Sequence, residues 1–341
     1  MPDLNVARTI VRAAFEDADR RIQPWIWGPP GTGKSSLVKE EAARLGLPVI
    51  DLRGVTLEPT DVRGFPHIVD GRTEWTRPEF LPESGEGVLF LDELAQAPGI
   101  VQSALLQLTL DRCVGEHRLP DGWRIVAASN RTEDRAGVGR VNAALLDRFL
   151  HVELELAFET WREWAIANGV SEEILAFLAF RTELFSAFDA ACVSSPTPRS
   201  WALASHVLSR CGDDPAVVRT ALAGAVGDGA AVEFLGFREH ARALPSIETL
   251  VADPDGIEIP QGPGELHALT SLVSCRARSG AGGEEAGALC RLAIRLPPEF
   301  GLIALRDLLL RHPEAVYGDE SVRAFLSEHS SLLSDSEEEA A

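Results

Sequence analysis

The chain has 341 residues, of which 45% are hydrophobic and 25% are charged, and its formal net charge is −20. This length supports one large domain or two domains with a sizeable core, and the composition is ordinary for a soluble globular chain. No apolar run approaches the roughly 20 residues needed to span a bilayer. Residues 1–21 carry acidic side chains and lack the apolar core of a signal peptide. We therefore expect a cytoplasmic protein.

The charge balance and the cysteines argue against two further classes. An excess of acidic residues repels a phosphate backbone, which argues against general nucleic-acid binding. The five cysteines are far apart in the sequence and form no CxxC pair. We therefore expect reduced thiols rather than a disulfide framework or a zinc site.

The predicted elements alternate between helix and strand over the first half of the chain. We predict helices over 3–20, 34–45, 98–112 and 142–149, and strands over 24–27, 47–52, 87–94, 123–130 and 151–156. The apolar run that opens the third strand, GVLFL, is typical of a strand buried on both faces. This alternation predicts an α/β fold with a parallel five-stranded sheet and helices on both faces.

Helical patterns replace the strands after Phe158, notably over 159–185 and 198–211. We divide the chain into an α/β nucleotide-binding domain, a smaller helical domain, a further helical C-terminal region and an acidic tail that we expect to be disordered. These parts are predicted to cover residues 1–157, 158–245, 246–330 and 331–341, respectively.

A glycine-rich loop follows the first predicted strand. The stretch GPPGTGKS, Gly28 to Ser35, fits the pattern G-x-x-x-x-G-K-[ST] and precedes a predicted helix. Its glycines let the backbone wrap phosphates at the helix N-terminus, Lys34 is expected to reach the β- and γ-phosphates, and Ser35 to hold Mg²⁺. The tight loop needs a compact point charge on a flexible side chain, which arginine does not provide. This need explains why the chain has a lysine at position 34, although Lys34 and Lys39 are its two lysines among 32 basic residues. The predicted nucleotide contacts are Gly28, Pro29, Pro30, Gly31, Thr32, Gly33, Lys34, Ser35 and Ser36.

Two adjacent acids, Asp92 and Glu93, end the third predicted strand. Carboxylates beside an apolar run are costly unless a cation or a catalytic role offsets the cost. We expect Asp92 to bind Mg²⁺ through water and Glu93 to polarise the attacking water as a base, which favours ATP hydrolysis. The alternative is that Asp92 caps the next turn and Glu93 is solvated.

Five segments together resemble an AAA+ ATPase over roughly residues 5–210: GPPGTGKS, LFLDEL, AASN, ALLDRF and SPTPRSW. Two further segments are similar to the MoxR-type branch of this family. The stretch LEPTDVRGFPHIVDGRTEWTRPEFLP looks like the insert within helix 2 of that branch, and DRCVGEHRLPDG looks like its hairpin before the fourth strand. The resemblance implies that the smaller helical domain is the lid.

The resemblance also implies roles for polar residues outside the loop. Asn130 matches sensor 1, which orients the water and the γ-phosphate, and Arg199 matches sensor 2 of the lid. Arg148 matches the arginine finger that reaches the ATP of a neighbouring subunit, where a cation stabilises transition-state charge. Arg135 and Arg140 are rival fingers. The structural alternative is capping of the strand end for Asn130, a salt bridge to Asp147 or nearby acids for Arg148, and a surface position at a helix start for Arg199.

The resemblance further implies a hexameric ring that acts on a protein client, and a partner with a separately encoded von Willebrand A domain. The insert bearing Trp75, Arg77 and Phe80 would contact the client or line the pore, although Trp75 and Phe80 are more often core residues of a hairpin. Residues beyond about 245 match no family segment.

Three hypotheses follow. The first is a MoxR-like ATPase that remodels or activates a protein partner. The second is a nucleic-acid-directed AAA+ motor or loader. The net charge argues against it, and four arginines in and near the insert argue for it: Arg53, Arg63, Arg72 and Arg77. The third is a nucleotide-gated scaffold that binds ATP but barely hydrolyses it. The presence of Glu93 argues against this hypothesis.

Overall fold

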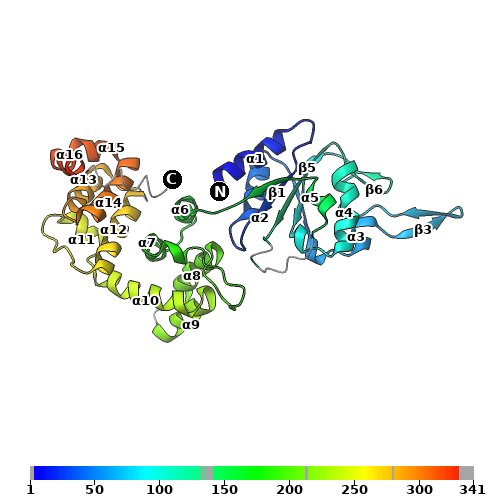
Figure 1. The fold of residues 1–341 in the computed structure, drawn as a ribbon. Coiled ribbons are helices and arrows are strands. Elements are labelled where there is room, and N and C mark those ends of the chain that lie inside the picture. The colour runs from blue at the N-terminus through cyan, green and yellow to red at the C-terminus, as the bar shows by residue number, and fades with distance from the viewer. Residues whose placement is uncertain (1–3, 132–133, 135–140, 212–213, 279, 330–341) are drawn as a thin grey trace. The chain divides into compact units, whose positions relative to one another are not determined.

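The chain forms two compact units in a computed structural model that describes residues 4–131, 134, 141–211, 214–278 and 280–329 (Figure 1). The first unit comprises Met1–Thr160 with Phe188–Val193, and the second comprises Trp161–Ala187 with Ser194–Ala341. The boundary between the units is close to the start of α6, which covers Phe158–Ala167.

A parallel five-stranded sheet forms the centre of the first unit. Its strands, in spatial order, are β2 (Val49–Arg53), β5 (Glu86–Asp92), β8 (Gly122–Ser129), β1 (Pro24–Trp27) and β9 (Leu150–Glu153). All neighbouring strands in this sheet pair in parallel. The predicted fold class is therefore confirmed. β8 lies between the strand that enters the glycine loop and the strand that ends in the two acids.

Helices cover both faces of this sheet because its strands present apolar side chains alternately to either side. Ile26 faces α1 (Leu4–Glu16) and α2 (Lys34–Arg44), with which it shares one core cluster. Its neighbour Trp25 belongs to the opposite cluster, with side chains from α4 (Gly99–Asp111) and α5 (Ala143–Leu146).

Two hairpins interrupt the alternation of strands and helices. A short helix, α3 (Pro59–Arg63), precedes a hairpin of β3 (Pro66–Val69) and β4 (Arg72–Trp75), which projects from the body of the first unit (Figure 1). Every residue of these two strands is exposed. Trp75 is 40% exposed, so the expectation of a hairpin core residue is wrong there. Phe80 is half-buried and packs against the core of the unit.

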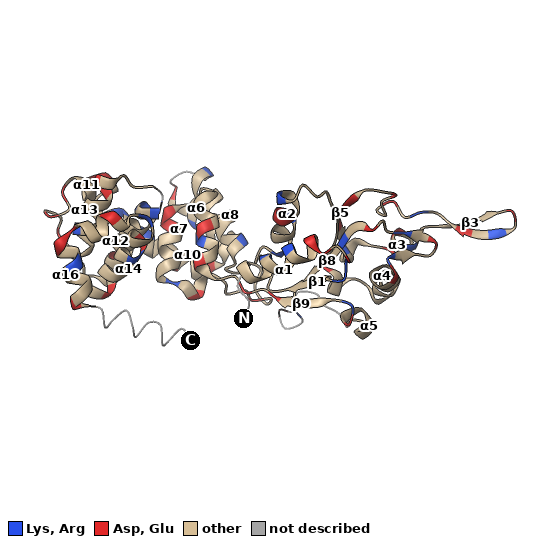
Figure 2. Cartoon of the chain, turned by 90° about the horizontal axis from the view of Figure 1, so that it is seen from above, with Lys and Arg blue, Asp and Glu red and all other residues tan. Residues whose placement is uncertain are grey.

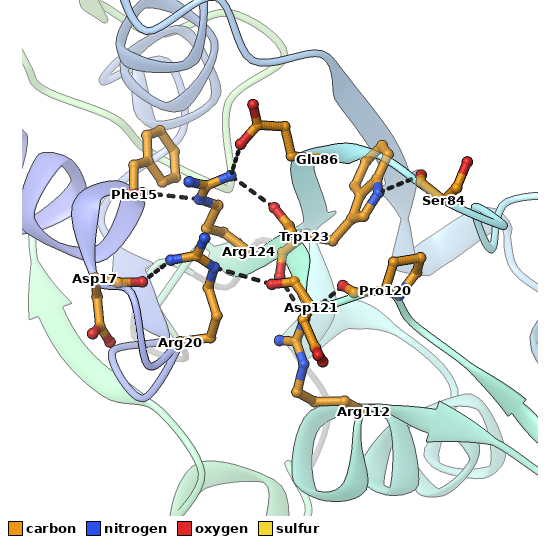
Figure 3. A network of polar contacts seen from close by, with 11 residues as sticks. Phe15, Asp17, Arg20, Ser84, Glu86, Arg112, Pro120, Asp121, Trp123 and Arg124 are labelled. Atoms are coloured by element: carbon orange, nitrogen blue, oxygen red, sulfur yellow. Dashed lines mark hydrogen bonds and ion pairs between the residues drawn. The ribbon is translucent and has the colours of Figure 1, made fainter.

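The second hairpin, β6 (Cys113–Val114) with β7 (His117–Arg118), lies where the sequence predicts one, before β8. Arginine side chains then hold the turn that enters β8 (Figure 3). The carbonyl oxygen of Trp123 accepts a hydrogen bond of 2.6 Å from Arg112, and those of Asp121 and Gly122 accept from Arg20 and Arg124. Burial lowers the pKa of the Arg112 guanidinium.

The described regular elements of the second unit are all helices. Its helices are α7 (Glu172–Phe180), α8 (Pro198–Arg210), α9 (Pro215–Val226), α10 (Asp228–Ala243), α11 (Ile247–Ala252), α12 (Pro263–Arg278), α13 (Gly283–Ala293), α14 (Pro298–Arg311), α15 (Pro313–Gly318) and α16 (Glu320–Glu328), together with most of α6. The helical pattern over 159–185 is broken after Ala167. Gly169 has a φ of 69°, and Ser171 is the N-cap of α7.

A buried ion cluster joins three helices of the second unit. The Asp307 carboxylate of α14 is fully buried, and it lies 3.3 Å from Nη2 of Arg162 in α6 and 2.5 Å from Nη2 of Arg278 in α12. Two charged donors offset the cost of burying this carboxylate. Nearby, burial raises the pKa of the Cys275 thiol to about 11. In the part of the chain described above, no helix is long and apolar enough to cross a membrane.

Candidate nucleotide-binding site

The glycine loop begins where β1 ends and stops where α2 begins. Gly31 and Gly33 have φ values of 80° and 85°, in the left-handed region that side chains with a Cβ rarely adopt. Gly28 is required for a different reason, since a Cβ there would lie 2.7 Å from the carbonyl oxygen of Leu154 in the adjacent segment after β9. The loop thus reaches its conformation because glycine occupies these three positions.

Lys34, the first residue of α2, turns its side chain inward over the loop. Its ammonium group donates hydrogen bonds of 2.8 Å to the carbonyl oxygens of both Gly28 and Pro29, and one of 3.0 Å to Oδ1 of Asn130. The residue is 8% exposed. These three oxygen acceptors hold the ammonium group of Lys34 at the mouth of the loop. There the ammonium group can replace the protein oxygens with phosphate oxygens as its partners.

Ser35 and Asp92 meet at the end of the sheet. The Ser35 hydroxyl donates a 2.7 Å hydrogen bond to one carboxylate oxygen of Asp92, and the other oxygen accepts a 3.0 Å bond from the backbone N–H of Glu93. A hydroxyl and a carboxylate are hard oxygen ligands that fit Mg²⁺, which is commonly bound by one or two protein groups together with phosphates and water. The residues present fit the predicted metal.

Glu93 follows β5 and has a left-handed conformation, with φ 55° and ψ 34°. The predicted strand over 87–94 is therefore too long at its C-terminal end, because this residue turns the chain into a short 3₁₀ helix, Leu94–Gln96. The side chain is half-buried. A carboxylate so placed has access to water while it stays next to Asp92.

Asn130 follows β8 and, as described, accepts from Lys34. The order of the strands explains this meeting, because β8 lies directly beside β1 and β5, and parallel strands end at the same edge. The structure thus brings together the lysine, the serine, the aspartate and the asparagine that the sequence singled out.

The candidate fingers lie further along the chain. Arg148 comes after α5, and its Nη1 lies 3.8 Å from Oδ2 of Asp147, whose side chain is 84% exposed. This pair agrees with the structural alternative for Arg148, and an exposed ion pair of this kind is weak. Arg135 and Arg140 lie outside the described residues. Arg199 is exposed on the first turn of α8, in the second unit, and its role toward the nucleotide stays a prediction.

Sequence reasoning missed two residues that contact the turn bearing Glu93. Ser129 is 1% exposed, and its hydroxyl accepts a hydrogen bond from the N–H of Ala95. Gly54, buried after β2, lies against the carbonyl of Glu93. The sequence does carry a signal for Ser129, because this serine follows the run WRIVAA in a strand that is buried. Gly54 has no comparable signal, because its contact is long-range.

Charged side chains of both signs are interspersed along the helices and strands of each unit (Figure 2). Arg77, one of the insert arginines, donates to the carbonyl oxygens of Leu81, Pro82 and Arg118. This arginine therefore stabilises the base of the projecting hairpin.

The strand order, the glycine loop after β1 and the acids at and after the end of β5 fit the fold of a P-loop AAA+ domain. Residues 25–149 match the family model of the AAA domain of the dynein-related subfamily. No curated protein matches the chain.

Several solved structures resemble the chain at low identity. NtrX from Brucella abortus in complex with ADP is 20% identical, with a TM-score of 0.42 over 81% of this chain and 63% of that one. The same protein in complex with ATP gives 18%, a TM-score of 0.43, and coverage of 82% and 64%. A RuvB mutant from Thermotoga maritima gives 16% and 0.41, over 74% and 80%. The chain thus spans less than two thirds of NtrX, and these scores carry no information on what it binds.

Proposed function

We propose that the protein is a Mg²⁺-dependent AAA+ ATPase of the MoxR type that hydrolyses ATP, as a hexameric ring, to remodel or activate a protein partner. The observation that carries the proposal is the meeting of Lys34, Ser35, Asp92 and Asn130 at one edge of the sheet, through hydrogen bonds of 2.7 to 3.0 Å. These four residues come from three elements and have the chemistry that a bound nucleoside triphosphate requires.

In this proposal the loop N–H groups and the ammonium of Lys34 bind the β- and γ-phosphates. Ser35 and Asp92 would hold Mg²⁺, which neutralises phosphate charge when it is bound. Asn130 orients the attacking water, and Glu93 accepts its proton. A neighbouring subunit contributes Arg148, whose ion pair with the exposed Asp147 is weak enough to exchange for a phosphate.

The exposed β3–β4 hairpin is the surface that we assign to the protein client. Ile68 is 80% exposed and Phe65 is 62% exposed, and both lie in or beside a hairpin that projects from the unit. Apolar side chains on such an exposed element commonly mark a binding surface. A von Willebrand A domain protein is one partner that fits the family resemblance.

Phosphate release at steady state tests the proposal. We expect Mg²⁺-dependent turnover by the wild type, retention of ATP binding with loss of turnover in Glu93→Gln, and loss of turnover in Arg148→Ala. Mixing inactive Glu93→Gln with inactive Arg148→Ala should restore part of the activity, because an intact site then forms between the two kinds of subunit. Normal hydrolysis by Arg148→Ala as a dilute monomer would refute the finger in trans.

The identity of the partner is tested by capture on the ATP-bound Glu93→Gln protein. A captured protein that is lost when Ile68 and Phe65 are both changed to serine supports the hairpin as its contact. Stimulation of turnover by DNA, with no captured protein, would instead favour the nucleic-acid-directed motor. Wild-type protein that binds ATP without turnover would favour the scaffold.

A further inference from the structure

The turn that follows β5 places Glu93 in a backbone conformation that is unusual for a residue other than glycine. Glu93 is one of four described residues other than glycine with a positive φ. The left-handed conformation is unfavourable for a residue with a Cβ, and it persists where the surrounding structure holds it. Leu94 and Ala95, which follow, are fully buried. The direction of the Glu93 side chain therefore depends on the contacts that this turn makes on its buried side.

Ser129 holds the turn from the side of β8. Its hydroxyl accepts a 2.9 Å hydrogen bond from the N–H of Ala95 and one of 3.0 Å from the indole N–H of Trp25 in β1, and it donates a 2.7 Å bond to the carbonyl of Ala128. All of these bonds are buried. A buried hydroxyl with every bond satisfied is a rigid contact point, since each lost bond leaves an unpaired group. One hydroxyl thus links the strand of the P-loop to the turn of Glu93.

Gly54 holds the same turn from the side of β2. A Cβ at this position would lie 2.7 Å from the carbonyl oxygen of Glu93 and 3.0 Å from the Cβ of Ala97. A Cβ is essentially never found 2.7 Å from a carbonyl oxygen, so any other residue at this position would displace either the turn or its own backbone. The backbone of Glu93 is therefore in direct contact with a glycine that the strained conformation needs.

We propose that Ser129 and Gly54 are positioning residues that fix the left-handed turn and so aim the carboxylate of Glu93. The inference rests on the proposed function, in which Glu93 accepts the proton of the attacking water. Neither residue is assigned a contact with ATP. Their loss should reduce the rate of the chemical step more than the affinity for the nucleotide, because misplacing a base by a small distance affects the transition state most.

Four variants of the full chain test the proposal. Ser129→Ala removes the acceptor of the Ala95 N–H, and Gly54→Ala pushes on the Glu93 carbonyl. We expect each to lower kcat by about 10- to 100-fold while the Kd for ATP changes by less than about threefold. Ser129→Thr keeps the hydroxyl and should restore kcat. Ser103→Ala removes an exposed hydroxyl that bonds to Gly99 on α4 and should leave kcat unchanged.

Trp25→Phe separates positioning from packing. It removes the indole donor but leaves the bond between Ser129 and Ala95, so it should lower stability while kcat falls by less than about threefold. A kcat of Ser129→Ala equal to that of Trp25→Phe, or a parallel loss of ATP affinity and kcat, would overturn the proposal.

Hydrogen exchange at the Ala95 amide tests the contact without any turnover. We expect Ser129→Ala to accelerate this exchange by about tenfold or more, and Ser103→Ala to leave it unchanged. If the wild type fails to hydrolyse ATP, the proposed function fails, while this measurement still reports whether Ser129 holds the turn. Exchange at Ala95 that is the same in Ser129→Ala and the wild type would overturn the contact itself.

Discussion

The ammonium group of Lys34 lies 3.0 Å from Oδ1 of Asn130, so the first residue of α2 and the residue after β8 share one hydrogen bond. The bond thus joins the start of the helix after the glycine loop to the end of the strand beside β1. It joins a group that would bind phosphate to a group that would orient water, and the two roles can be separated by substitution.

Lys34→Ala should weaken ATP binding by about 100-fold, because the site loses the cation that lies at the mouth of the loop. The chain offers a matched control in its other lysine. Lys39 forms a 2.7 Å ion pair with Asp51, and its side chain is 47% exposed. Lys39→Ala should leave the Kd within about twofold. Equal effects of the two changes, measured by calorimetric titration, would refute the assignment of Lys34.

Asn130→Ala should act on turnover rather than on binding. Removing an amide that is aimed at developing charge or at the attacking water costs about 100- to 1,000-fold in kcat. Phosphate release under saturating ATP measures this loss, and an equilibrium titration should give a Kd close to that of the wild type. Asn168→Ala, a change at an exposed amide in the turn after α6, is the control. A large rise in Kd for Asn130→Ala alone would make Asn130 a binding residue.

Asp307→Asn should destabilise the second unit. The substitution leaves Arg162 and Arg278 facing a neutral group in a buried position, which costs about 3–5 kcal/mol of the free energy of unfolding. Asp255→Asn is the control, since this side chain is 71% exposed and 3.8 Å from Arg291. Its effect should stay below about 1 kcal/mol. Urea unfolding followed by circular dichroism measures both, and similar values would show that the buried cluster contributes little.

His267 should make the stability of the second unit depend on pH. Burial lowers the pKa of this imidazole below its ordinary value of 6.5, and the ring lies between those of Phe180 and Phe300. The unfolded chain therefore takes up this proton at a higher pH than the folded chain. The stabilising contribution is fully present above pH 6.5 and is lost as the pH falls through the folded pKa.

The variant His267→Phe removes this titration and keeps an aromatic ring between the two phenylalanines. We expect the melting temperature of the variant to fall less than that of the wild type between pH 7.5 and pH 5.5. A difference between the two proteins that stays constant over this range would contradict the assignment.

Much of the sheet could be predicted because its signals are local. The pattern in PWIW gives β1 with the same bounds as the structure, and the loop motif gives the start of α2 at Lys34. The resemblance named Asn130 as a residue of the site, and its meeting with Lys34 follows from the place of β8 between β1 and β5. Polar residues at strand ends were therefore predictable as a group.

The remaining features depend on contacts between distant segments. The end of β5 at Asp92 follows from the left-handed conformation of Glu93, which Ser129 and Gly54 stabilise from two other elements. The break between α6 and α7 is an exception, because it is local: it falls at Gly169 and at the N-cap Ser171, which the apolar pattern over 159–185 does not mark. The exposure of Trp75 also depends on the hairpin projecting from the unit, which composition alone does not reveal.

The scarcity of lysine has a consequence for how the protein can be modified. Apart from the amino terminus, an amine-directed reagent or a ubiquitin-conjugating enzyme has two targets, and one of them, Lys34, is folded onto carbonyl oxygens with 8% exposure. Lys39, close to the P-loop on the surface of α2, is the accessible one. An amine-directed label should therefore attach at Lys39, whose side chain is 47% exposed, rather than at Lys34.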